Sequence, residues 1–144
     1  PSAPLFAIDQ TFVSLSAVPA RAGGTIDASQ LPFAKPTEEL LQLNGIAGSV
    51  ALANHAEGYR VRLTWQAEHF PSLLLWMSNR GRPMAPWNSR HLALGMEPIC
   101  SPFGLGVDTA LADNPIARSG TPTARNFTAG EVFTTRYRIA AEAL

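Results

Sequence analysis

The sequence predicts an all-β domain of the sandwich type, and three observations predict it. Twelve prolines and eleven glycines divide the 144 residues into short segments, as expected for many strands joined by turns. Residues 59–66 and 91–97 alternate between two faces, the pattern of strands with one face in the core. Residues 72–78 form an apolar run that is typical of a strand covered on both faces. We therefore expect one β-sandwich domain over residues 1–144, or part of a larger one, with at most one or two short helices.

The prolines, glycines and capping residues place the other elements along the chain. Residues 11–18 alternate only in part, and the prolines and glycines of residues 19–36 indicate a long connection. Residues 37–41 favour a short helical turn, with Thr37 as its N-cap and acidic residues in its first turn. The remaining expected elements are a strand at 48–53, one short helix at 108–117 broken by Pro115, and a last strand at about 131–140.

The charges of the chain balance, which bears on its partners. Eleven basic residues oppose eleven acidic ones, so no net charge attracts the chain to nucleic acid or to an acidic membrane. No apolar run approaches the roughly 20 residues that a membrane helix needs. We expect the partner to be a small neutral molecule or another protein.

The N-terminus and the cysteine content bear on localisation. The chain begins with proline and lacks a basic segment followed by an apolar one, so no signal peptide is expected. Its single cysteine, Cys100, cannot form a disulfide within the chain, which fits the cytoplasm. The missing initial methionine indicates either processing or a piece of a longer chain, and the expected macromolecular partner is a missing N-terminal half or a second copy.

The segment from residue 75 to residue 106 has the composition of a sugar site. Asparagine, arginine and carboxylate groups hydrogen-bond hydroxyls, and an indole ring stacks on the apolar face of a pyranose. The three histidines lack metal-ligand spacing, and no phosphate-binding glycine loop occurs, so we expect neither a metal nor a cofactor. The candidate site residues in this segment are Trp87, Asn88, Arg90, His91 and Glu97.

The strand Leu92–Pro98, which reads Leu-Ala-Leu-Gly-Met-Glu-Pro, resembles the late strand of the aldose 1-epimerase (galactose mutarotase-like) family. The segments at 75–79 and 86–88 are similar to the strand and loop that precede it, and 131–140 is similar to the family's last strand. The resemblance starts near residue 45. It implies that the chain is the C-terminal half of the family's supersandwich domain. In the family's late strand, apolar residues lead into a glycine and then an acidic residue.

The resemblance implies an isomerase that interconverts the anomers of an aldose. In that family a glutamate on the late strand, which matches Glu97, removes the proton from the C1 hydroxyl, and a histidine protonates the ring oxygen. The family's histidine motifs lie in its N-terminal half, and none of His55, His69 and His91 matches them. His91 lies six residues from Glu97, or about 20 Å along a strand.

Several alternatives remain open at this stage. Glu97 could be an exposed strand carboxylate or the partner of an arginine, and His91 a structural residue. Trp87 could stack on a sugar or cap the core. The chain could also be a carbohydrate-binding β-sandwich without catalysis, in which Trp87, Asn88 and Arg90 hold the sugar.

Overall fold

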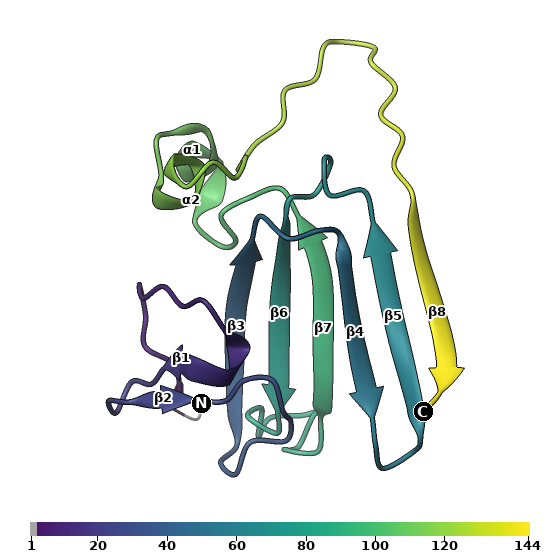
Figure 1. Ribbon diagram of the computed structural model, residues 1–144. Helices are drawn as coiled ribbons and strands as arrows, with labels where there is room; N and C mark the ends of the chain where they lie inside the picture. Colours follow the sequence, from purple (N-terminus) through teal and green to yellow (C-terminus); the bar gives the residue numbers. More distant parts are fainter. Residues whose placement is uncertain (1–2) are drawn as a thin grey trace. The chain divides into compact units, whose positions relative to one another are not determined.

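The computed structural model describes residues 3–144 and confirms the all-β class (Figure 1). Eight strands, two short α-helices and one 3-10 turn make up its regular structure. In chain order they are the turn Leu15–Ala17, β1 (Val18–Pro19), β2 (Thr25–Ile26), β3 (Thr37–Asn44), β4 (Ser49–Asn54), β5 (Tyr59–Trp65), β6 (Ser72–Asn79), β7 (Leu92–Ile99), α1 (Gly106–Leu111), α2 (Pro115–Arg118) and β8 (Tyr137–Ala143).

The strands form three small sheets. The order in the two larger ones is β3-β6-β7 and β4-β5-β8, and β1 pairs with β2 in the third. Strand β5 is the centre of its sheet and runs antiparallel to both neighbours, with Ala51 opposite Arg62 on one side and Ala140 opposite the same arginine on the other. The expected strands at 48–53, 59–66, 72–78 and 91–97 are thereby confirmed as β4, β5, β6 and β7.

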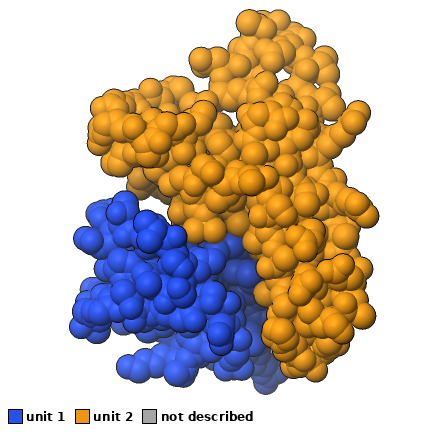
Figure 2. All heavy atoms as spheres, in the orientation of Figure 1, with its two compact units in different colours: residues 1–41, 75–95 blue, residues 42–74, 96–144 orange. Residues whose placement is uncertain are grey.

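The described chain divides into two compact units (Figure 2). The first contains residues up to 41 together with 75–95, and the second contains residues 42–74 and 96–144. The division falls inside β3, β6 and β7, so each of these strands contributes one end to each unit.

The first unit is organised around the end of β6. Asn79, almost fully buried, accepts a hydrogen bond from the backbone N–H of Phe33 and donates to the carbonyls of Phe33 and Lys35. Phe33 in turn packs edge-on against Phe6, with ring centroids 5.8 Å apart. This buried amide hydrogen-bonds three backbone groups, so it holds the connection before β3 against the sheet while its own polar atoms stay paired.

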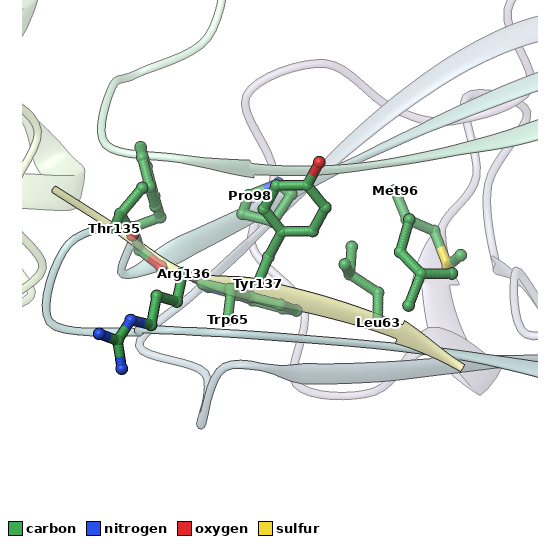
Figure 3. A pocket seen from close by; sticks show the side chains of 9 residues that line it. Leu63, Trp65, Met96, Pro98, Thr135, Arg136 and Tyr137 are labelled. Carbon is green, nitrogen blue, oxygen red and sulfur yellow. Dashed lines mark hydrogen bonds between the residues drawn. The ribbon is translucent and has the colours of Figure 1, made fainter.

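In the second unit, strands from the two larger sheets face each other (Figure 3). An apolar pocket of about 410 Å³ lies between β5 and β8 of one sheet and β7 of the other. Its wall includes Leu63, Trp65, Met96 and Pro98. This facing of inward side chains is the arrangement of a β-sandwich.

The expected helical turn at 37–41 was wrong, because these residues open strand β3. Thr37, Glu39 and Leu41 are buried on one face, which is the period of a strand and not of a helix. The Glu39 carboxylate accepts hydrogen bonds from the Thr37 hydroxyl and from the backbone N–H groups of Leu5 and Phe6. These distant partners compensate for burying a carboxylate, and a capping pattern in the sequence does not reveal them.

Residues 11–18, which alternate only in part, hold the 3-10 turn. Two other boundaries differ from the sequence-based expectation. The last strand begins at Tyr137, six residues later than expected. The helix expected at 108–117 is two helices, because Pro115 occupies the first turn of α2 and Asn114 caps it through the N–H groups of Ile116 and Ala117.

Candidate functional site

Strand β7 presents Glu97 to solvent in the second unit. Its neighbours Met96 and Pro98 line the apolar pocket, so the alternation of the strand directs Glu97 to the opposite face. This matches the expected division of the strand into an apolar face and a face that carries the glutamate. An exposed carboxylate on a strand is open to a hydroxyl group from solution.

The other four candidate residues lie together in the first unit, in the connection between β6 and β7. Trp87 and His91 are half-buried, whereas Asn88 and Arg90 are exposed. Asn88 has a φ of 47°, in the left-handed region that asparagine tolerates better than most residues. The backbone of this connection is tied to the sheet where the N–H of Arg80 donates to the carbonyl of His91 at 2.8 Å.

A line of hydrogen bonds fixes the ring of His91. The Ser78 hydroxyl, which is buried, donates to Oε1 of Glu38 at 2.8 Å and lies 2.8 Å from Nδ1 of His91. The second oxygen of Glu38 accepts from Nε1 of Trp76 at 2.9 Å and lies 3.3 Å from Nε of Arg82. The contact with Arg82 is an ion pair, and the hydrogen bond to this oxygen comes from Trp76.

This pattern favours one tautomer of His91. A serine hydroxyl has one proton, and here it goes to Glu38. A proton on Nδ1 of His91 would then be donated to the Ser78 oxygen and complete the line. In a neutral ring of that tautomer, Nε2 would be an acceptor.

Arg82 lies between two indole rings beside this line. Its guanidinium carbon is 4.7 Å from the ring centroid of Trp76 and 4.9 Å from that of Trp87. Stacking of a cation on both rings, together with the ion pair to Glu38, ties the β6–β7 connection to strands β3 and β6. One face of Trp87 is therefore occupied by Arg82.

Sequence reasoning missed Glu38, Trp76, Ser78 and Arg82 as parts of this cluster. Trp76 is half-buried and Arg82 is partly covered. The available signal was the two-residue period of β6, which places Trp76 and Ser78 on one face. It became informative only once residues 37–44 were known to form the neighbouring strand β3.

Cys100 is a poor nucleophile candidate, both for the surroundings of Glu97 and for the cluster around His91. Burial raises the pKa of its thiol, and Arg125 opposes this only in part. Its Sγ lies 3.7 Å from the carbonyl of Pro122. A thiol with a raised pKa has little thiolate at neutral pH, so it behaves as a small packing residue.

The tautomer of His91 is directly testable. We expect nitrogen chemical shifts of the neutral ring to show the proton on Nδ1 in the wild-type chain, and mainly on Nε2 after Ser78→Ala, because the acceptor for Nδ1 is then lost. His55, exposed in the β4–β5 turn, is the internal reference. A wild-type His91 that carries its proton on Nε2 would contradict the hydrogen-bond line.

No protein-family model matches the chain, and no curated protein or solved structure matches it either. Among residues 3–144, no three histidine, cysteine or acidic side chains come together as metal ligands would. None of the helices in the same residues is long and apolar enough to cross a membrane.

Proposed function

We propose that the chain is an aldose 1-epimerase-like isomerase that acts at the anomeric carbon of a sugar, with Glu97 as its general base. The observation that carries the proposal is the exposed Glu97 on β7, on the face away from the apolar pocket. It adds to the resemblance of the Gly95-Met96-Glu97-Pro98 segment to the family's late strand. A general base must come within about 3 Å of the proton that it removes, which an exposed carboxylate permits.

The proposed reaction starts with removal of the C1 hydroxyl proton by Glu97. The C1–O5 bond then breaks as the ring oxygen takes up a proton from water, and the open aldehyde rotates about C1–C2. Closure on the other face of the carbonyl gives the second anomer, releases the proton of the ring oxygen to water and returns the proton from Glu97. The family's acid belongs to the half of the enzyme that this chain does not resemble, so the proposal assigns the chain the base alone.

A non-catalytic carbohydrate-binding module is the second candidate, and the cluster in the first unit favours it. Trp76 and Trp87 provide indole rings, and Glu38 and His91 provide hydrogen-bonding groups beside them. Apolar rings with a few polar groups are the usual composition of a sugar site. In this reading a sugar would use the face of Trp87 that Arg82 leaves free.

Anomer exchange of glucose and galactose, followed by NMR, separates the two proposals. An isomerase is expected to accelerate exchange in proportion to the amount of chain added. A binding module would shift the resonances of Trp87 and its neighbours on addition of sugar without accelerating exchange. The sugar is added up to about 100 mM, well above the millimolar dissociation constant of a weak complex. If neither acceleration nor shifts occur in that range, both proposals fail.

A further inference from the structure

Strand β8 forms an outer edge of the sheet β4-β5-β8, beside β5 (Figure 1). No strand within residues 3–144 pairs with its other side. Six of its seven residues are exposed, among them Tyr137 at 72% and Ile139 at 65%. An exposed edge of this length offers a row of free N–H and C=O groups to another strand.

The hydrogen bonds with β5 decide which residues of β8 face outward. The N–H of Leu144 donates to the carbonyl of Gly58 at 2.9 Å, which continues the β5–β8 register by one pair. Because hydrogen-bonded and non-hydrogen-bonded pairs alternate in an antiparallel ladder, the even-numbered residues of β8 direct their backbone groups toward β5. The residues with outward N–H and C=O groups are Tyr137, Ile139, Ala141 and Ala143.

We propose that β8 pairs antiparallel with β8 of a second copy of this chain, around a two-fold axis at Ala140. This register aligns all seven residues, and it matches outward groups of one strand with outward groups of the other. Tyr137 then lies opposite Ala143 of the second copy, and Ile139 lies opposite Ala141. Two sheets of three strands become one sheet of six, by an isologous contact.

Complementary charges on β8 are the reason for proposing a second copy of the chain as its partner. In this register Arg138 lies opposite Glu142 of the second copy, in a non-hydrogen-bonded pair where side chains come closest. Symmetry generates the same pair twice. Within each chain Glu142 already pairs with Arg60 at 3.2 Å, so each glutamate would lie between two arginines.

The apolar face of β8 fits the same contact. Ile139 and Tyr137 are on the face that lines the pocket with Leu63 and Trp65, and both remain largely exposed in the single chain. Pairing sets a small alanine side chain of the second copy beside each of them. The two apolar faces then continue across the junction and cover part of these large side chains.

The test is the mass of the chain in solution, measured by sedimentation and light scattering at micromolar concentrations. We expect a dimer for the wild-type chain. Arg138→Glu replaces both attractive pairs with repulsive ones, so the dimer dissociation constant should rise roughly tenfold or more. Glu142→Arg should weaken the dimer similarly, and circular dichroism checks that both variants remain folded. A monomeric wild-type chain at 100 µM, about a hundred times a micromolar dissociation constant, would overturn the proposal.

Mixing the two variants gives the sharpest result. Arg138→Glu carries two acidic residues on β8 and Glu142→Arg carries two basic ones, so each opposes itself but complements the other. We expect the mixture to form a one-to-one heterodimer. The control is Arg21→Glu, the same charge reversal at an exposed arginine outside β8, which should leave the dimer intact. A dimer that survives Arg138→Glu, or that is lost equally with Arg21→Glu, would rule out this register and this edge.

Discussion

The Glu97→Gln variant is expected to lose the acceleration of anomer exchange, by about a hundredfold or more, which is the usual contribution of a general base. An amide has nearly the shape of the carboxylate but cannot accept a proton from the C1 hydroxyl near neutral pH. Because Glu97 is exposed on β7, the substitution should leave the stability of the fold almost unchanged. The measurement is NMR exchange between the anomers of glucose and galactose, at matched concentrations of folded chain.

Glu57→Gln is the matched control for this experiment. Glu57 is also an exposed glutamate, in the turn between β4 and β5, and the change alters the charge of the chain by the same amount. It should retain the wild-type rate. Equal rates for wild type and Glu97→Gln, with exchange accelerated in both, would remove Glu97 from the role of base and keep the isomerase activity.

The Gly48→Ala substitution is expected to destabilise the fold by about 3 kcal/mol, the sum of backbone strain and overpacking. Gly48 is buried before β4, has a φ of 71° and accepts the backbone N–H of Trp65 at 2.9 Å. A β-carbon there would lie 2.5 Å from the carbonyl oxygen of Trp65 and 3.2 Å from the side chain of Ala67. Since the closest atom belongs to the backbone of β5, the strand itself would have to move.

Gly58→Ala separates the two causes of this loss. Gly58 has almost the same φ, 70°, but no atom lies within 4 Å of the position that a β-carbon would take. Its substitution should cost about 1 kcal/mol from the left-handed backbone alone. Urea unfolding of both variants measures the difference, and equal losses at the two glycines would show that the contact with Trp65 adds nothing.

The sequence by itself determined the strands whose periodicity is local. The alternation of residues 59–66, the apolar run at 72–78 and the turn-forming glycines and prolines predict β5, β6 and the all-β class correctly. The alternation of residues 91–97 also separated Glu97 from the apolar face of β7. These predictions hold because the two-residue period of a strand is a property of the chain itself, whichever strand pairs with it.

The tertiary structure decided what depends on partners distant in sequence. Glu39 is a strand residue because backbone N–H groups more than thirty residues away bind its carboxylate, and local propensity alone favoured a helical turn. Glu38, Ser78 and His91 form one line because β3 and β6 are neighbours in a sheet, although forty residues separate the first two. A buried polar group must find a partner somewhere, and only the folded chain determines which distant group that partner is.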